Sequence, residues 1–459
     1  MNPFGEEFPE LHPALQTECA SRVDQIEGKG LADVRRYTGD IRETMRLVLL
    51  YDAYERYRPA FDELIVEQIR RTDGPAPVPF GRDLLALLRR RGLGEDEALR
   101  VFAIFFQIRR AHYFIVEGLV GSSLCMREFR RQLWDNVFTH DIRHYECCLW
   151  NRMEDFSTLL LGETGTGKGA AAAAIGRSGF IPFDEKKQQF AESFTRGFLS
   201  INLSQFPENL IESELFGHRK GAFTGAVEAH QGVFARCSPY GAIFLDEVGE
   251  VSAPVQIKLL RVLQERVFSP VGSHETVRFR GRVIAATNRS LTELRGRSGF
   301  REDFYYRLCS DVITAPALRQ RLGEDADELR ALVETIVRRI AGEGATELLP
   351  IVQGGLKEVN RDGYAWPGNV RELEQAVRQI LVKRRYQPAT AASGAPSDRA
   401  ERLASKIGEG SLDADTLLGE YCTLLYERCR NLEEVARRTK LDRRTVKRYL
   451  GAVAEPKEG

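Results

Sequence analysis

The sequence predicts a multidomain protein: an α-helical N-terminal domain, an α/β core of the P-loop type and a C-terminal helix-turn-helix. Three observations predict it: a glycine-rich turn between an apolar strand and an alanine-rich helix at 159–174, short apolar runs alternating with helical segments, and a basic helical pair near the end. Continuous apolar strands separated by helices are typical of a parallel sheet covered on both faces. The expected strands lie at residues 158–161, 198–202, 242–245, 283–287 and 311–314.

Composition narrows the class of protein. The 459 residues are 43% hydrophobic, so the chain has enough apolar side chains for packed cores and is not disordered throughout. Lys+Arg and Asp+Glu both total 66, so a nucleic-acid surface has to be a local patch. Residues 1–10 hold three glutamates and do not resemble a secretory signal. The most apolar stretch, 101–120, contains charged residues, which favours a buried or amphipathic helix over a membrane span.

Pattern changes along the chain set the expected domain boundaries. Residues 1–150 show helical periodicity and no catalytic constellation, so we expect a regulatory region there. Residues 385–411 are rich in alanine, proline and glycine and predict a flexible linker. The remaining domains are the α/β part at 151–316, a helical lid at 317–384 and the helix-turn-helix at 412–455. The eight cysteines lack a CxxC pair, so we expect buried thiols in a cytoplasmic protein.

The glycine-rich turn is the predicted nucleotide site. Its residues are Gly162, Glu163, Thr164, Gly165, Thr166, Gly167, Lys168 and Gly169. Glycines let backbone N–H groups close on phosphate oxygens, the helix N-terminus adds partial positive charge, and Lys168 adds a full one. Gly169 stands where a Ser or Thr hydroxyl commonly binds Mg²⁺, so the metal has to depend more on water and on other residues.

Two carboxylates follow the apolar strand at 242–245. The carboxyl edge of a parallel sheet is where ligands bind. Asp246 is therefore predicted to hold Mg²⁺, directly or through water, and Glu247 to orient and deprotonate the attacking water. Asn288, after the strand at 283–287, is a weaker candidate for the γ-phosphate or the water, because Asn is also a common turn residue.

Several longer motifs carry a family resemblance. They are ESELFGH at 212–218, GAFTGA at 221–226, QIKLLRVLQE at 256–265, AATNR at 285–289, FREDFYYRL at 300–308 and WPGNVRE at 366–372. Over about residues 155–384 the chain resembles the sigma-54-dependent transcription activators, bacterial enhancer-binding proteins of the AAA+ class. The resemblance implies an AAA+ ATPase core with a helical lid, with ATP and Mg²⁺ as its cofactors.

The resemblance also implies a contact loop and a ring. The loop residues Gly221, Ala222, Phe223, Thr224, Gly225 and Ala226 look like the segment that touches sigma-54. Arg301 and Arg307 resemble arginine fingers that act on the site of a neighbouring subunit, which fits the hexameric rings of the family. The alternative for both arginines is a surface ion pair with Glu302 or Asp303.

Three further residues are carried over from the family. Asn202 looks like the switch asparagine that restrains Glu247, and Arg371 resembles the second sensor on the lid. Asn369 is expected to cap the lid helix, with Glu372 completing a capping box.

Residues 431–450 predict a helix-turn-helix. Asp442 is placed to cap the second helix, and the segment carries a local net charge of +4. Arg443, Arg444, Lys447 and Arg448 on that helix are the predicted DNA contacts. Lys440 occupies a turn position where glycine is usual, at a cost of about 1 kcal/mol if its backbone is left-handed. A basic helical pair for protein contact is the alternative.

We therefore expect a cytoplasmic sigma-54-dependent activator without a membrane segment. It binds double-stranded DNA upstream of promoters, forms a homo-oligomeric ring and hydrolyses ATP to remodel the sigma-54 RNA polymerase holoenzyme in its closed complex. Two alternatives remain: a DNA-binding regulator with weak or absent ATPase activity because of Gly169, and an AAA+ remodeller of another protein.

Overall fold

The computed structural model describes residues 12–71, 73–296, 299–360, 364–388, 403, 406–408, 412–429 and 431–452. The chain divides into two compact units, Met1–Arg384 and Arg385–Gly459. The predictions for residues 1–10 and for most of the 385–411 linker lie outside the described residues.

A five-stranded parallel sheet forms the centre of the first unit, in the order β4-β5-β8-β1-β9. Its strands are β1 (Thr158–Leu161), β4 (Phe198–Asn202), β5 (Ala242–Asp246), β8 (Arg282–Thr287) and β9 (Asp311–Thr314). All five expected strands are present, and β5 and β8 are each one residue longer than the sequence predicted. Because the strands are parallel, the glycine-rich turn after β1 and the carboxylates at the end of β5 lie at the same edge.

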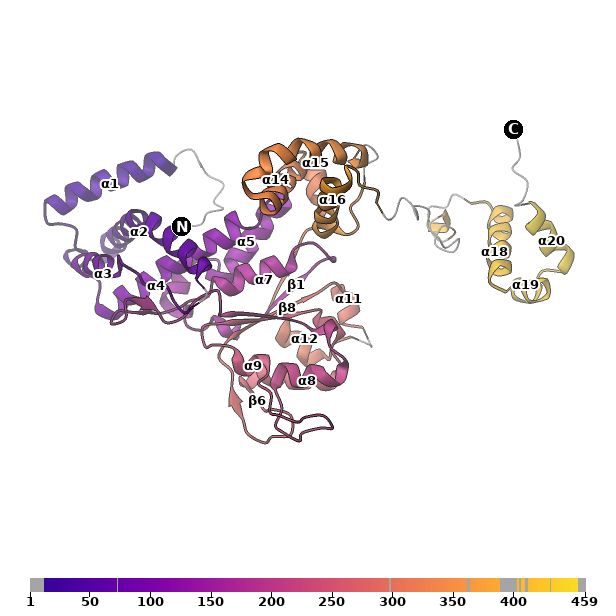
Figure 1. Ribbon diagram of the computed structural model, residues 1–459, viewed down its shortest axis with the longest axis horizontal. Coiled ribbons are helices and arrows are strands. Elements are labelled where there is room, and N and C mark those ends of the chain that lie inside the picture. Colours follow the sequence, from indigo (N-terminus) through magenta and orange to yellow (C-terminus); the bar gives the residue numbers. More distant parts are fainter. Residues whose placement is uncertain are drawn as a thin grey trace. The chain divides into compact units, whose positions relative to one another are not determined.

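Side chains alternate between the two faces of this sheet. Leu159 and Leu161 pack in one hydrophobic core, whereas Leu160 packs in the other. The first core is covered by the helices α8 (Glu208–Phe216), α9 (Val233–Arg236), α10 (Ala253–Glu265), α11 (Leu291–Leu294) and α12 (Glu302–Leu308). The second contains α7 (Lys168–Arg177) and helices of the N-terminal region. Figure 1 shows α5 and α7 on one side of the sheet and α8, α9 and α12 on the other.

The N-terminal region is helical, as predicted. Its helices are α1 (His12–Gly28), α2 (Gly39–Arg70), α3 (Gly81–Arg90), α4 (Glu95–Ala111), α5 (Leu124–Phe138) and α6 (Ile142–His144), with π-helical turns at His112–Glu117 and Tyr145–Leu149. Phe102 of α4 and Leu133 of α5 belong to the same buried cluster as Leu160 and Phe244 of the sheet. The region therefore packs directly on the α/β core through a shared hydrophobic interior.

A short hairpin strengthens this contact. It pairs β2 (Phe183–Asp184) with β3 (Gln189–Phe190). Phe106 of α4 stacks on Phe190 with ring centroids 4.1 Å apart, and the Arg89 guanidinium donates two hydrogen bonds of 2.8 Å to the Glu185 carboxylate. This hairpin was not predicted, because strands of two residues carry no detectable periodicity.

The lid consists of α13 (Leu318–Glu324), α14 (Glu328–Ala341), α15 (Ala345–Asn360) and α16 (Asn369–Lys383). The segment 317–384 was predicted as a helical lid with helices at 325–341 and 369–384, and α14 and α16 lie within these two ranges. The helix α15 was missed, because Pro350, Gly354 and Gly355 lower its helical propensity.

A second small hairpin joins β6 (Val267–Phe268) and β7 (Val277–Arg278), and single 3₁₀ turns lie at Val34–Arg36, Met153–Asp155, Leu203–Gln205, Val248–Glu250 and Gly342–Gly344.

The second unit contains α18 (Ala414–Cys429), α19 (Leu432–Thr439) and α20 (Arg443–Ala452). Cys422 and Leu425 of α18 pack with Val435 of α19 and Val446 of α20 in a small core. The two helices expected between residues 431 and 450 are therefore present, and α18 supplies the third side of their core.

Two further sequence predictions can be compared with the structure. Within the described residues, none of the helices has the length and apolar character needed to cross a membrane. The prediction of buried thiols is wrong for most cysteines. Only Cys422 is buried, while Cys147 and Cys148 are exposed on the π-helical turn after α6, where both side chains lie outside the packed core.

Candidate functional site

The glycine-rich turn has the backbone of a phosphate-binding loop. It connects the end of β1 to α7, whose N-cap is Gly167 with a left-handed φ of 96°. Gly165 has φ 83°, and a Cβ atom there would lie 2.3 Å from the carbonyl oxygen of Gly368 on the lid. Glycine is therefore required both by the backbone conformation and by the close approach of the lid.

Lys168 is the first residue of α7 and is largely buried, with 7% of its surface exposed. Its Nζ donates hydrogen bonds to the carbonyl oxygens of Gly162 (2.7 Å) and Glu163 (3.0 Å). Burial lowers the pKa of the ammonium group, and the negative charges of Glu247 and Asp246 oppose that change. The loop thus holds a cation at its centre, close enough to both carboxylates to interact with them.

Asp246 and Glu247 are half-buried at the carboxyl end of β5. The backbone N–H of Glu247 donates to Oδ1 of Asp246 at 3.1 Å. Glu247 has a left-handed backbone with φ 56°, which is strained for a residue with a side chain. Such strain is concentrated at functional positions, where the surrounding structure fixes the direction of a side chain.

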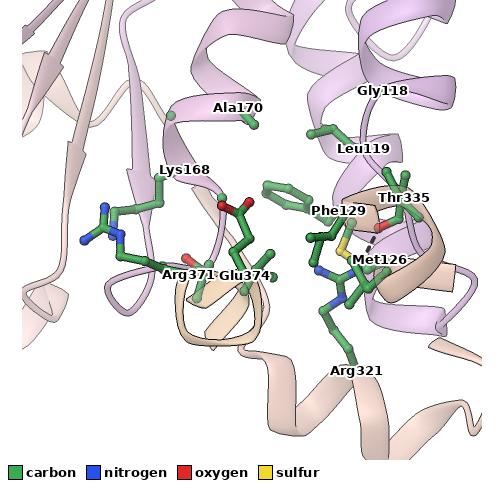
Figure 2. Close-up of a pocket in the computed structure, with 18 of the residues that line it drawn as sticks. Gly118, Leu119, Met126, Phe129, Lys168, Ala170, Arg321, Thr335, Arg371 and Glu374 are labelled. Atoms are coloured by element: carbon green, nitrogen blue, oxygen red, sulfur yellow. Dashed lines mark hydrogen bonds between the residues drawn. The ribbon is translucent and has the colours of Figure 1, made fainter. Parts of the chain in front are cut away.

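These groups line one cavity of about 340 Å³. Lys168, Asp246, Glu247 and Arg371 form its polar side. Leu119, Met126 and Phe129, from the segment around the start of α5, form an apolar wall, and Figure 2 shows this wall facing Lys168 and Arg371 across the cavity. A charged wall opposite an apolar wall suits a ligand with a polyanionic end and a flat apolar end.

The lid is attached to the phosphate loop by Asn369. Its Oδ1 accepts a hydrogen bond from the backbone N–H of Leu318 (2.7 Å), and its Nδ2 donates to the Thr164 carbonyl oxygen and to the Glu163 carboxylate (both 3.1 Å). The predicted capping role of Asn369 is therefore wrong: Gly368 is the N-cap of α16, and the Asn369 side chain is used for these tertiary contacts. Glu372 does accept from the backbone N–H of Gly368, at 2.8 Å.

Gly169 lies on the wall of the cavity in the first turn of α7. Outside the neighbouring backbone of α7, the one atom of the described residues within 4 Å of a Cβ built there is Cε1 of Phe244, at 3.9 Å. Packing therefore leaves room for a side chain at this position. Steric exclusion does not explain why the chain has glycine here instead of a Ser or Thr whose hydroxyl could bind Mg²⁺.

The predicted site residues Asn202 and Asn288 lie at the same edge of the sheet but do not line the cavity. Asn202 pairs with Asp246 in the register of β4 and β5, and its Oδ1 accepts from the backbone N–H and the hydroxyl of Ser204. No hydrogen bond links Asn202 to Glu247 among the described residues. Asn288 is exposed just beyond β8.

Of the two candidate arginine fingers, Arg301 is the N-cap of α12 and Arg307 lies in the last turn of that helix, and neither lines the cavity of its own subunit. Arg301 is exposed and forms an ion pair with Asp303 at 2.9 Å, the surface pair considered as its alternative role. Nε of Arg307 donates to the carbonyl oxygen of Leu263 at 3.0 Å. Neither arginine can complete the site within one chain, so any such role requires a second subunit.

Residues 221–226 form a compact loop beyond α8 (Figure 1), in which Phe223 and Thr224 are exposed and Ala226 is buried. Backbone hydrogen bonds between His218 and His230 close the base of the loop, and the Gly221 N–H donates to the carbonyl oxygen of Ala226 at 2.8 Å. Phe223 is 37% exposed and lies edge-on to the His218 ring. The loop thus presents an aromatic side chain on a closed, glycine-containing backbone.

In the C-terminal unit, the predicted DNA contacts Arg443, Arg444, Lys447 and Arg448 are all exposed on α20. Asp442 caps this helix as predicted, because its Oδ1 accepts from the backbone N–H groups of Arg444 and Thr445. Lys440 has the left-handed backbone anticipated for the turn, with φ 57°.

Comparison with known proteins places these features in a family. A family model described as the sigma-54 interaction domain matches residues 145–314. The regulatory protein AtoC of Escherichia coli is 31% identical over 381 residues, which cover 82% of this chain and 72% of AtoC. The Nif-specific regulatory protein of Klebsiella pneumoniae is 40% identical over 59% of this chain and 45% of its own length. A structure of NtrX from Brucella abortus with ADP aligns at 20% identity and a TM-score of 0.45, covering 82% of this chain and 81% of NtrX.

The chain belongs to the sigma-54-dependent transcription activators. The long alignment with AtoC decides this, because it reaches well beyond the sigma-54 interaction domain. The chain spans slightly less than half the length of the Nif-specific regulators that it matches.

Some ion pairs around the cavity of this activator were not predicted, because no sequence motif marks them. Arg319 forms an ion pair with Glu163 across the loop–lid boundary, and Arg321 forms a buried one with Glu328, both with 2.5 Å separations. Glu328 also accepts from the backbone N–H of Ser122, just before α5. The local signal for these contacts is the pair of alternating arginines in the segment LRQR at 318–321. That signal does not identify the residues that the arginines contact.

Proposed function

We propose that this chain is an ATP-driven transcription activator that remodels sigma-54 RNA polymerase while bound to DNA. The observation that carries the proposal is the shared cavity of Lys168, Asp246, Glu247 and Arg371, in a chain that also exposes the loop at 221–226. Family membership supports the choice of sigma-54 as the protein partner.

In the proposed mechanism, the phosphate loop and Lys168 bind the triphosphate of ATP, and the adenine ring lies against the apolar wall of Leu119, Met126 and Phe129. The Glu247 carboxylate accepts a proton from water as that water attacks the γ-phosphorus and the bond to the β-phosphate oxygen breaks. Arg371 contacts the phosphates from the lid. Arg301 and Arg307 of a neighbouring subunit stabilise the negative charge that develops, which makes turnover dependent on a ring, hexameric in our proposal.

Mg²⁺ fits this site with Asp246 as its protein ligand. Within the described part of the chain, no three His, Cys, Asp or Glu side chains gather into a metal site, so the phosphates and water have to supply most ligands. When bound, the ion neutralises charge on the β- and γ-phosphates. Gly169 contributes no side chain to it.

Force reaches sigma-54 through the loop in this proposal. The cavity edge follows β5, and β5 pairs with β4, whose last residue is Asn202. We propose that Asn202 and Asn288 respond to the γ-phosphate at this edge, and that the exposed Phe223 and Thr224 engage sigma-54. The four basic residues of α20 bind DNA phosphates or base edges.

The deciding experiment measures Mg²⁺-dependent ATP turnover against protein concentration for three proteins: wild type, Glu247→Gln and Thr224→Ala. We expect turnover per chain to rise with concentration as subunits assemble, and Glu247→Gln to bind ATP but to lose about 10²–10⁴-fold in turnover. Thr224→Ala is the matched control, which retains turnover and loses binding to sigma-54. Absent turnover in the wild type at all concentrations would favour a DNA-binding regulator, and unchanged sigma-54 binding by Thr224→Ala would favour another protein partner.

The proposed DNA binding by α20 is tested by measuring how the affinity for duplex DNA depends on salt concentration. Because phosphate contacts release counterions, affinity for duplex DNA should fall steeply with salt, and Lys447→Ala should reduce the slope of log affinity against log salt by about 1. Arg437→Ala is the control, since Arg437 on α19 is already engaged with Glu434 at 2.7 Å. A salt-insensitive interaction would instead assign α20 to protein contact.

A further inference from the structure

A second cavity, of about 370 Å³, lies at the opposite end of the sheet from the phosphate loop. Gly241, just before β5, and Arg282, at the start of β8, mark that amino-terminal edge. The other walls come from residues 145–154 at the end of the N-terminal region and from Gly179 and Phe180, just after α7. No motif of the family falls on this cavity, and the proposed ATPase mechanism does not use it.

An arginine without a carboxylate partner lines this cavity. Arg282 is 9% exposed, and its Nη2 donates to Oδ1 of Asn136 (2.8 Å) and, more weakly, to the hydroxyl of Thr158 (3.3 Å). Its Nε has no hydrogen-bond partner, and no ion pair involves Arg282 among the described residues. A buried cation in this position is costly unless a negative charge lies close by. The carboxylate of Asp311 attracts it only at longer range.

The other charged groups around the cavity are mostly positive as well. Arg280 lines its exposed rim, and the fully buried Arg110 lies behind Gly179, where its guanidinium donates to backbone carbonyl oxygens (2.6 and 2.7 Å). Glu154 is the only acidic side chain among the lining residues. The balance of charge therefore favours an anion.

Aromatic rings supply the remaining recognition surface. Trp150 and Phe180 are half-buried with ring centroids 4.7 Å apart, and Tyr240 is 41% exposed at the mouth. The hydroxyl of the buried Tyr145 donates to Oε1 of Gln107 at 2.8 Å, which fixes the floor of the cavity. Rings around an opening suit a flat ligand that they can stack against.

We propose that this cavity is a second small-molecule site, which binds a planar aromatic carboxylate. The ring of the ligand packs against Trp150 and Phe180, and its carboxylate supplies the countercharge for Arg282, with Arg280 at the entrance. The volume lies within the range of sites for small organic ligands. A nucleotide fits less well, because a single buried arginine does not match a di- or triphosphate.

The test uses the full chain and calorimetric titration with 1-naphthoate, compared with the uncharged naphthalene-1-carboxamide. We expect saturable binding of one naphthoate per chain, and at least about tenfold weaker binding of the amide, because it lacks the charge. Trp150→Ala should weaken naphthoate binding by about tenfold, and Arg280→Gln by up to about fivefold. Arg278→Gln, an exposed arginine outside the cavity, should leave the affinity unchanged.

Lys168→Ala separates the two cavities, because it alters only the nucleotide site. The proposal is overturned by the absence of saturable naphthoate binding, by equal affinity for acid and amide, or by binding that Lys168→Ala abolishes and Trp150→Ala leaves intact. Loss of ATP turnover has no bearing on this readout, so failure of this site and failure of the proposed ATPase function are distinguishable.

Discussion

The two ends of the parallel sheet treat charge in opposite ways. At the carboxyl end, two buried cations near the nucleotide cavity have acidic neighbours: Lys168 lies near Asp246 and Glu247, and Arg321 is paired with Glu328. At the amino end, the buried Arg282 interacts with neutral oxygens of Asn136 and Thr158. The first end is built around balanced charges, and the second keeps an excess of positive charge.

This contrast shows that a buried charge can be held in two ways. A close carboxylate neutralises it, so that removing either partner leaves the other unpaired. Neutral acceptors take hydrogen bonds from one nitrogen of Arg282 but leave its charge, which burial disfavours, and this lowers the pKa of Arg282 to about 10. Replacing Arg321 and replacing Arg282 should therefore lower the free energy of unfolding by different amounts.

The largest effect is expected for Arg321→Met. The Glu328 carboxylate is fully buried, and without Arg321 it keeps neutral donors among the described residues: the backbone N–H groups of Ser122 and Ser123 and, at 3.5 Å, the Ser122 hydroxyl. We expect the free energy of unfolding to fall by about 3–5 kcal/mol, measured by denaturant titration with circular dichroism. Arg330→Met, which removes an exposed ion pair with Asp327, is the control and should cost about 0–1 kcal/mol. If both variants lost the same free energy of unfolding, the buried ion pair would contribute no more to stability than the exposed one, and the prediction would be wrong.

Arg282→Met should have an intermediate effect. The change removes the hydrogen bond from Arg282 to Oδ1 of Asn136, whereas the Thr158 hydroxyl still accepts from Nδ2 of Asn136. It also removes an uncompensated buried charge. We expect a loss of about 1–3 kcal/mol in the same titration. A loss as large as that of Arg321→Met would mean that Arg282 is as fully neutralised as its counterpart, and the comparison between the two ends would fail.

The smallest effect concerns Glu163, at the carboxyl end. Hydrogen bonds from Arg319, and then from Asn369, lower the pKa of its exposed carboxylate to about 2. A carboxylate with a lowered pKa stabilises the folded state above its ordinary pKa of about 4.5, and this contribution disappears as the pH falls towards 2. The difference in Tm between wild type and Glu163→Gln should thus be small near neutral pH and shrink to zero in acid.

A matched control for this measurement is Glu302→Gln, on the exposed start of α12, for which the described residues include no ion-pair partner. Its difference from wild type should not change over the same pH interval. A constant difference for Glu163→Gln would show that Arg319 and Asn369 do not hold the loop to the lid in solution.

Much of the fold was predictable because its signals are local. Each strand of the sheet is a continuous apolar run, and the phosphate loop is contiguous from β1 to α7. The hairpin at 183–190 and the helix α15 were missed, since the first is too short for periodicity and the second contains proline and glycine. Asn369 misled the prediction because its capping pattern is local, whereas its real partners, Leu318 and Thr164, come from other segments.

The sequence by itself determined the family, the phosphate loop, the pair Asp246–Glu247 and the exposed motif at 221–226, because each is encoded by neighbouring residues whose spacing sets the local backbone. Only the tertiary structure decided how the N-terminal helices share the core of the sheet and which charges meet. Trp150, Phe180 and Arg282 come together from three separate segments. The burial of Arg282, which makes a nearby anion favourable, results from the packing of several segments and cannot be predicted from any one of them.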